Sequence, residues 1–471
     1  MNYNSQKLVV CLHELYDTPE IHYILEQVLS GFLELKYEIF FSKEANDDII
    51  LLKREDKFIQ IDFSFFKNYI REDGIKGKIL PSTPLGKLSV GTKLNILHKY
   101  DIPILFGEPV LHISIDSILI GIDVFGSAFF MLTRLEEIYK SGRDEHDRFS
   151  LKSSILSEEN LVEYPIVDIY VDLLGKAILK LWPDKMISSK PGRLLVSCDV
   201  DFLYEYNLRG LKVLKRLARN ILLDRSLYKF IETLKRSFAI NILGNLKYDS
   251  YNSYDYLMRS CEKEKVDLAF YFIARNKKEK IDGNYDISSP DVLRLIQRIF
   301  KRGHEIGLHG SYYSYDNFFE LEQEKQLLVN VLEKSGLSQD VLKGGRQHYL
   351  RWNNETSLIW DKNGLIYDST LGFAEHVGFR CGTSKEYNFF DVINRKQLNI
   401  VIRPLICMEV SLLDKKYMNL DHKHAFPIAS NLKKRCLDYG GNFTLLWHNS
   451  SFNHKEDYEL FEKIIKNEGK R

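Results

Sequence analysis

The sequence predicts an α/β protein in which a smaller N-terminal α/β domain precedes a larger α/β domain. From about residue 191 onward, short apolar runs alternate with longer amphipathic segments, a pattern typical of parallel strands joined by helices. A cluster of Pro, Ser and Gly at 184–193 separates this part from the preceding region. The larger domain is therefore expected to contain a parallel sheet, either open or closed into a barrel.

Residues 1–150 mix strand and helix candidates and are expected to form the small α/β domain. Strands are expected at 7–12, 37–42, 48–53, 58–66 and 111–124, and helices at 19–35 and 125–142. Residues 151–190 are expected to form a helical connector, because 163–182 has helical periodicity. The N-terminal region shows no motif that indicates a particular chemistry, and the charged segment 144–150 is interpreted as a solvated loop.

The second α/β domain is expected to span residues 191–471. Strands are expected at 193–201, 267–274, 304–310, 365–370, 398–405 and 442–450. Helices are expected between them, at 253–266, 290–303, 319–336, 354–364 and 427–441. The sequence contains no internal repeat, so this alternation is the main indication of the fold.

Composition sets limits on the partners of the chain. Its 471 residues allow two or three domains at about 150 residues each, and 44% of them are hydrophobic, enough for a sizeable core. The 66 Lys and Arg residues nearly balance 65 Asp and Glu residues, so no nucleic-acid partner is expected. One basic run, KVLKRLARN at 212–220, is of a kind that is most often a solvated helix face.

The sequence also predicts a cytoplasmic protein. Its six cysteines show no CxxC spacing, which is typical of reduced thiols in a reducing compartment. The N-terminal apolar run at 8–12 is short and has no preceding basic region, so we predict no signal peptide. No window reaches the roughly 18 apolar residues that a membrane span needs.

Polar side chains end three of the predicted strands. Asp199 and Asp201 are two residues apart, and because side chains alternate along a strand, both carboxylates lie on one face. His309 and His448 end two further strands, and active sites of parallel barrels lie at such carboxyl ends. A lone Asp pair is more often a cap or turn. Together with two histidines it favours a site in which one carboxylate binds a cation and the other acts as a base.

Other polar residues are weaker candidates. His304 is an odd number of positions from His309 and is interpreted as structural. The segment GGRQHYLRW contributes Arg346, His348 and Arg351, of which an arginine can orient a carboxylate but is more often a surface ion-pair partner. The remaining candidates are Asp368, His376 and Arg380 in a long loop at 368–384, and His422 with His424, which are interpreted as a solvated pair.

The order of these motifs resembles that of polysaccharide deacetylases, the NodB-homology or carbohydrate esterase family four group. The similar segments are LLVSCDVD, RGHEIGLHGSYYS, GGRQHYLRW, YDSTLGF and LLWHN, and together they cover about 191–450. The resemblance implies a distorted (β/α) barrel. It also implies an enzyme that removes N- or O-linked acetyl groups from sugars with a divalent metal, usually zinc.

The resemblance assigns a role to each strand-end residue. Asp199 matches the catalytic base, and Asp201 resembles the metal carboxylate, displaced by one because this chain has Asp-Val-Asp where Asp-Asp is common. His309 matches the first metal histidine, Arg346 the arginine that orients the base, and His448 the general acid. With FRCGTS, the set is most similar to a bacterial subgroup that pairs this barrel with an uncharacterised N-terminal domain and is associated with surface-polysaccharide synthesis.

One position departs from the family pattern. The second metal histidine should follow His309 by four residues, where this chain has Tyr313, and tyrosine is a poor zinc ligand. His348 is the best candidate for the third protein ligand; otherwise the metal is bound weakly or is absent.

Three functions follow from this pattern. The first is a metal-dependent hydrolase that acts on an acetylated, nucleotide- or lipid-linked sugar. The alternatives are a metal-independent amidohydrolase on the same barrel and a non-catalytic glycan-binding or assembly protein. Binding alone needs neither an acid nor a base, so the catalytic residues count against the last alternative.

Overall fold

The computed structural model describes residues 7–98, 101–185, 187, 190–205, 212–276, 281–283 and 285–467. Contacts between Cα atoms divide the chain into two compact units. Unit 1 combines 1–193, 350–407 and 431–444, and unit 2 combines 194–349, 408–430 and 445–471. Each unit is built from separate stretches of chain, whereas the ranges expected from the sequence, 1–150, 151–190 and 191–471, are continuous. Those domain ranges stay a prediction.

Unit 1 contains a mixed six-stranded sheet in the order β2-β1-β3-β4-β8-β7. Its strands are β1 Leu8–His13, β2 Tyr37–Ser42, β3 Ile49–Arg54, β4 Lys57–Asp62, β7 Gly107–Ile113 and β8 Ser117–Ile122, and a small antiparallel pair is formed by β5 Gly86–Leu88 and β6 Ile102–Ile104. Burial alternates along β1, which fits a sheet with unlike faces. Its helices are α1 Pro19–Leu25, α2 Ser64–Arg71, α3 Val124–Leu132, α4 Leu135–Tyr139, α5 Ile155–Glu158 and α6 Ile166–Leu181.

The segment 350–407 packs within unit 1 and contributes α12 Asn354–Lys362, β13 Tyr367–Asp368, β14 Tyr387–Asp391 and β15 Lys396–Ile402. A buried charge network holds it: Glu137 accepts hydrogen bonds from Arg380, at 2.7 Å from Nη2, and from Arg134 Nε at 2.8 Å. Burial raises the pKa of Glu137, but the two guanidinium groups outweigh it and lower that pKa to about 2. Arg380, a weaker site candidate, is thus a structural ion-pair partner.

Unit 2 is built on parallel strands. β9 Leu194–Val200, β10 Asp267–Ile273, β11 Glu305–Gly310 and β12 Gly344–Gln347 pair in the order β12-β11-β10-β9. Beyond β9 runs the end of β17 Phe443–Leu446, where the Trp447 N–H donates to the Ser197 carbonyl at 2.9 Å. All residues of β9 after Leu194 are buried, as expected for a strand covered on both faces. Among the described residues the strand order of this unit is open, so the closed form of the expected barrel is not observed.

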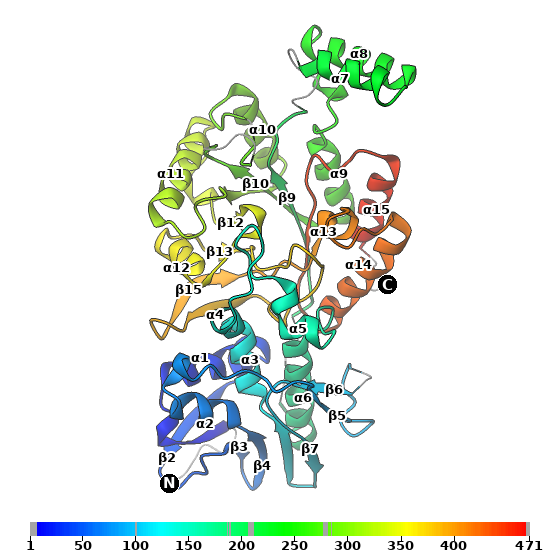
Figure 1. Ribbon diagram of the computed structural model, residues 1–471. Coiled ribbons are helices and arrows are strands. Elements are labelled where there is room, and N and C mark those ends of the chain that lie inside the picture. Colours follow the sequence, from blue (N-terminus) through cyan, green and yellow to red (C-terminus); the bar gives the residue numbers. More distant parts are fainter. Residues whose placement is uncertain are drawn as a thin grey trace. The chain divides into compact units, whose positions relative to one another are not determined.

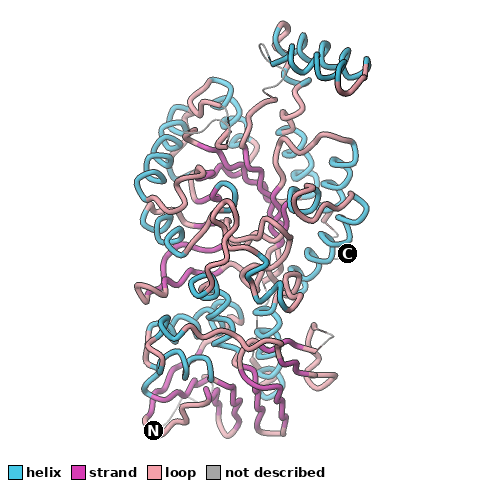
Figure 2. The backbone as a smooth tube through the Cα atoms, in the orientation of Figure 1, coloured by secondary structure: helices cyan, strands magenta, loops and turns pink. Residues whose placement is uncertain are grey.

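Figures 1 and 2 show the helices of unit 2, one pair of which stands apart from the strands at the top of the view. They are α7 Lys212–Leu222, α8 Leu227–Asn241, α9 Tyr254–Glu264, α10 Pro290–Lys301, α11 Phe318–Lys334, α13 Glu409–Leu413 and α15 Lys455–Ile465, while β16 Cys407–Met408 and α14 His422–Asp438 each have residues in both units. α10 begins with a proline and buries residues spaced three and four apart, namely Val292, Leu295, Ile296 and Ile299. No helix in the described part of the chain is both long and apolar enough to cross a membrane.

Close backbone contacts between the strands depend on glycine. A Cβ atom at Gly345 in β12 would lie 1.8 Å from the Leu308 carbonyl oxygen of β11. A Cβ at Gly307 would lie 2.5 Å from the Tyr271 ring. These glycines allow β10, β11 and β12 to align so that their carboxyl ends meet at one edge.

Candidate active site

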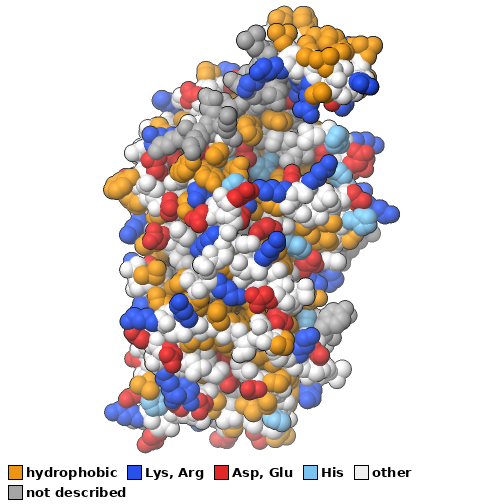
Figure 3. All heavy atoms as spheres, viewed as in Figure 1, with side chains coloured by type: hydrophobic (Ala, Val, Ile, Leu, Met, Phe, Trp, Pro, Cys, Tyr) orange, Lys and Arg blue, Asp and Glu red, His pale blue; other side chains and the backbone are white. Residues whose placement is uncertain are grey.

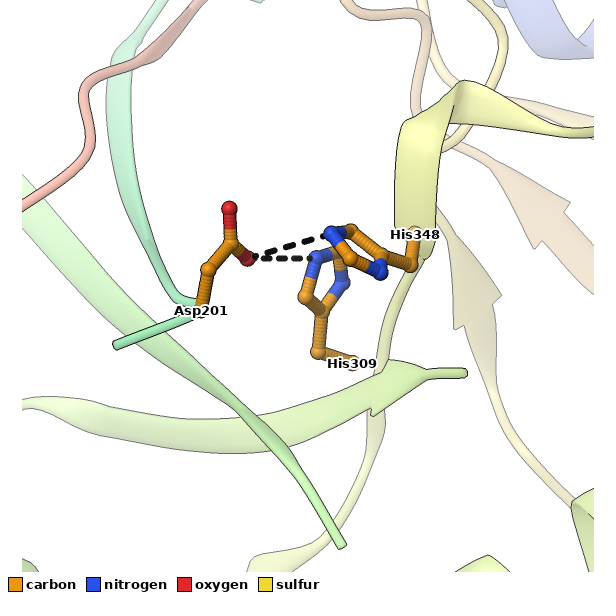
Figure 4. A group of neighbouring side chains, drawn as sticks. All are labelled: Asp201, His309 and His348. Atoms are coloured by element: carbon orange, nitrogen blue, oxygen red, sulfur yellow. Dashed lines mark ion pairs between the residues drawn. The ribbon is translucent and has the colours of Figure 1, made fainter. Parts of the chain in front are cut away.

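Three potential metal ligands converge at the carboxyl ends of the strands of unit 2 (Figure 4). Asp201 follows β9 directly, His309 lies in β11, and His348 follows β12. Asp201 Oδ1 is 3.3 Å from His309 Nε2 and 3.6 Å from His348 Nε2. One ligand atom of each residue lies within 4.8 Å of the others. Tetrahedral zinc with ligands at about 2.0 Å requires ligand atoms about 3.3 Å apart, so this spacing suits a small divalent cation.

Hydrogen bonds on the far side of each imidazole determine which nitrogen faces the cluster. His309 Nδ1 donates to the Arg346 carbonyl oxygen at 2.9 Å, so in the neutral ring Nε2 is an acceptor. Among the described residues, His309 Nε2 and Asp201 Oδ1 are buried atoms without a hydrogen-bond partner. Two acceptors that face each other at 3.3 Å repel unless a cation lies between them. The donor set therefore fits a metal.

Asp282 holds His348 in the same way. His348 Nδ1 donates to Asp282 Oδ1 at 3.1 Å, which directs Nε2 toward Asp201, and the Tyr312 N–H also donates to Asp282 Oδ1 at 2.7 Å. Burial lowers the pKa of His348, but Asp201 and Asp282 outweigh it and raise that pKa to about 9. A carboxylate behind a metal-binding histidine is the usual arrangement that fixes the tautomer of the ring.

Replacing Asp282 by Asn is expected to weaken metal binding by about 10- to 100-fold, because the carboxylate that orients His348 is lost. The dissociation constant for zinc, measured by competition with a chelating dye, checks this. Asp286→Asn is the matched control, since Asp286 caps a nearby turn through Ser288 and does not contact the cluster. Equal zinc affinity in D282N and D286N would contradict this role of Asp282.

Asp199 lies beside the cluster, fixed by an arginine. Arg346 Nη1 donates to Asp199 Oδ1 at 2.8 Å and to Ser197 Oγ at 2.9 Å, and its guanidinium carbon lies 5.1 Å from the centre of the Tyr271 ring. The other carboxylate oxygen, Asp199 Oδ2, is 3.6 Å from His309 Nε2. One oxygen of Asp199 is thus held by Arg346 while the other faces the ligand cluster.

His448 lies on the opposite side of Asp201. Its Nε2 is 3.6 Å from Asp201 Oδ2, and its Nδ1 donates to Glu409 Oε1 at 2.7 Å. The same carboxylate oxygen accepts the His448 backbone N–H at 2.9 Å and the Ser451 hydroxyl at 2.7 Å. Glu409 therefore fixes the ring so that Nε2 points toward the site.

Burial and neighbouring charges shift the pKa values of His448 and Asp201 in opposite directions. Burial lowers the pKa of His448, but Glu409 and then Asp201 outweigh it and raise that pKa to about 10. Burial raises the pKa of Asp201, but His348 and His448 outweigh it and hold that pKa well below its ordinary value. The Asp201 carboxylate and the protonated His448 ring therefore stabilise each other's charged forms.

The six residues predicted from the sequence as catalytic or metal-binding lie together in unit 2: Asp199, Asp201, His309, Arg346, His348 and His448. Tyr313, which stands where the family has a histidine, is not part of the ligand cluster; its side chain is 37% exposed and packs on the Tyr312 ring. His348 is the third member of the cluster, and its role as a ligand stays a prediction.

The weaker candidates lie elsewhere. His304 contacts Glu262 at 3.1 Å from Nε2 to Oε1, which fits its interpretation as structural. His422 pairs with Asp457, and His424 with Asp421. Arg351 donates to the His146 carbonyl at 2.7 Å, Asp368 caps the turn at Thr370, and His376 Nδ1 donates to the carbonyl of the next residue.

Two residues that orient the site were missed. Glu409 directly follows an apolar run at 405–408, so the same strand-end signal that revealed Asp199 could have revealed it. Asp282 lies between β10 and α10 in the segment KIDGNYD, which has no strand pattern. No signal in the sequence pointed to it.

Comparisons with known proteins give distant similarities. Residues 8–183 match the sequence model of a family of unknown function, DUF7033. No curated protein matches the chain. A crystal structure from Mycobacterium smegmatis described as a polysaccharide deacetylase is 14% identical, with a TM-score of 0.37 over 60% of this chain and 85% of that one.

Two further crystal structures are similar at the same level. One from Pseudomonas aeruginosa PAO1, also described as a polysaccharide deacetylase, is 13% identical, with a TM-score of 0.36 over 66% of this chain and 90% of that one. The Puue allantoinase is 14% identical, with a TM-score of 0.33 over 48% of this chain and 69% of that one. A functional proposal must therefore rest on the side chains of the site.

Proposed function

We propose that this protein is a metal-dependent hydrolase that removes an acetyl group from an N- or O-acetylated sugar. One observation carries the proposal: Asp199, held by Arg346, lies beside the Asp201–His309–His348 cluster, and His448 lies on the other oxygen of Asp201. The order of the sequence motifs, which resembles that of polysaccharide deacetylases, supports it.

The proposed roles of Asp199 and His448 follow from which atom of each side chain faces the site. Arg346 occupies Asp199 Oδ1, so Asp199 Oδ2 is the oxygen that accepts a proton from the attacking water. Glu409 holds His448 Nδ1, so His448 Nε2 donates a proton to the departing sugar nitrogen or oxygen. A divalent cation, for which zinc is the first choice, would be held by Asp201, His309 and His348 and would supply Lewis-acid polarisation of the acetyl carbonyl.

The proposed setting is bacterial surface-polysaccharide metabolism in the cytoplasm, with a nucleotide- or lipid-linked sugar as the substrate. The six cysteines form no disulfide and five of them are buried, which supports a reducing compartment. The proposal includes a distorted (β/α) barrel for residues 191–471, preceded by a domain at 1–150 and a helical connector at 151–190. The parallel order β12-β11-β10-β9 supports the barrel.

Acetate release from acetylated amino sugars and sugar esters tests the proposal. Removal of metal by a chelator is expected to abolish release, and zinc or cobalt is expected to restore it, because the three ligands hold the cation. Release that persists after chelation, without stoichiometric metal, would favour the metal-independent amidohydrolase. Glycan binding without any release of acetate would favour the non-catalytic alternative.

A further inference from the structure

The helical hairpin of α7 and α8 in unit 2 exposes an unusual amount of apolar surface. The described residues include 24 exposed large apolar side chains, and eleven of them lie in 212–243, less than a tenth of the chain. They are Leu214, Ile221, Leu222, Leu223, Leu227, Tyr228, Ile231, Leu234, Phe238, Ile242 and Leu243. Figure 3 shows hydrophobic side chains gathered on the surface over α7 and α8. An exposed apolar patch of this size marks an interaction site.

The apolar residues follow the helical period, so they form one face. On α8, Leu227, Ile231, Leu234 and Phe238 are spaced three and four apart, and each is at least 43% exposed. The tip between the helices adds Leu222 and Leu223, which are 72% and 75% exposed. An amphipathic helix normally turns such a face toward the protein core, whereas here the face points outward.

Hydrogen bonds join the two helices. Asn220 is the buried residue of α7, and its Nδ2 donates to Thr233 Oγ1 of α8 at 2.8 Å and to the Lys229 carbonyl at 3.1 Å. Beside this contact lies a cavity of about 830 Å³ with basic residues in its lining, among them Lys215, Arg216, Arg219 and Arg236. The inner side of the hairpin therefore combines these polar groups with the buried Ala239 and Ile240 of α8, while eleven large apolar side chains lie exposed on the outside.

Charge identifies what covers the hairpin. Residues 212–243 carry eight Lys and Arg against two acidic residues, a net charge of +6, although the whole chain carries only +1. Two such hairpins would repel each other, which disfavours a second copy of the chain. Anionic lipid headgroups complement this charge while the acyl region accepts the leucines. We propose that the α7–α8 hairpin docks the protein on an anionic membrane surface.

The hairpin is linked to the site by a short anchor. Glu205, four residues after Asp201, accepts a hydrogen bond from Arg236 Nη2 of α8 at 2.6 Å and also pairs with Arg216 of α7. Its Oε2 accepts the Ser250 hydroxyl at 2.6 Å as well. Docking would therefore hold the segment that carries Asp199 and Asp201 near the membrane surface. The inference concerns where the protein acts and stands whether or not the proposed reaction is correct.

Vesicle flotation with the full chain tests the docking directly. The protein is expected to float with vesicles that contain phosphatidylglycerol and to remain unbound with phosphatidylcholine alone. The double variant Leu222→Gln/Leu223→Gln removes apolar surface without changing charge and is expected to weaken binding by about tenfold or more. Lys215→Glu, and a rise in salt concentration, are expected to weaken it as well.

The matched control is Phe319→Gln on α11, because Phe319 is 69% exposed in the same unit but lies outside the hairpin. It is expected to bind like the unchanged protein, and circular dichroism checks that each variant is folded. No binding to anionic vesicles, or equal binding by L222Q/L223Q and F319Q, would overturn the proposal. So would a dimer in solution that L222Q/L223Q converts to a monomer, since a second copy would then cover the face.

Discussion

Replacement of Asp199 by Asn is expected to lower the rate of acetate release by about 10³-fold, because the proposed base, which accepts a proton from water, is lost. Asn is nearly isosteric, and its side-chain oxygen can still accept the Arg346 hydrogen bond, so the fold should be kept. The metal content should also be unchanged, because the ligand cluster consists of Asp201, His309 and His348. Acetate release and bound metal are measured on the same preparation.

Asp267→Asn provides the matched control for this variant. Asp267 is an exposed carboxylate at the amino-terminal start of β10, in the same unit but at the opposite end of a strand. Its replacement is expected to leave the rate unchanged. If D199N retains the activity of D267N, Asp199 is not the base. If D199N instead loses its metal, the carboxylate is a ligand.

Replacement of Arg346 by Met is expected to lower the free energy of unfolding by about 3–5 kcal/mol, because Asp199 is left as a buried, unpaired charge. The two side chains are only 1% and 3% exposed, so water does not screen the loss. The backbone carbonyl that accepts from His309 remains in the variant. Unfolding by urea, followed by tryptophan fluorescence, measures the change.

Two further variants separate this effect from a general loss of an arginine. Arg302→Met breaks a partly exposed pair with Glu262 and is expected to cost about 1 kcal/mol or less. The double variant R346M/D199L removes both buried charges and is expected to recover much of the stability that R346M loses. Equal losses of unfolding free energy in R346M and R302M would show that the buried Arg346–Asp199 pair contributes no more to stability than the partly exposed pair.

The regular parts of the fold were predictable because their patterns are strong. The expected strand at 267–274 corresponds to β10, because an uninterrupted apolar run follows Asp267. The expected helix at 319–336 corresponds to α11, because its apolar residues recur at helical spacing. Local hydrogen bonds explain the misses in the N-terminal region. The expected strand at 58–66 ends at Asp62, whose Oδ1 accepts the backbone N–H of Ser64, and α2 begins there.

A second miss has a similar cause. The expected strand at 111–124 is instead the hairpin of β7 and β8, because the Ser114 N–H bonds to the Ser117 carbonyl and turns the chain. The discontinuous composition of unit 1 was also beyond the sequence, since no local pattern shows that 350–407 packs with residues before 194. Contacts between segments far apart in the chain produce no periodic pattern in the sequence.

The residues of the candidate site also differ in how well the sequence predicts them. Residues that touch the reacting centre lie at strand ends, where alternation reveals which face they occupy, and so Asp199, His309 and His448 could be found. The residues that orient them act through single hydrogen bonds from irregular segments. Asp282 is the clearest example, because its role depends only on where a loop places one carboxylate.

The two carboxylates lie at the end of β9, since Asp199 is the residue before its last one and Asp201 follows it directly. The backbone at the end of β9 therefore sets the distance between the proposed base and the proposed first ligand. The register between β9 and β10, in which Asp199 pairs with Tyr271 and Val200 with Phe272, fixes the position of this strand end. A one-residue slip of β9 would therefore displace both carboxylates at once, whereas changes in the surrounding loops would leave their spacing unchanged.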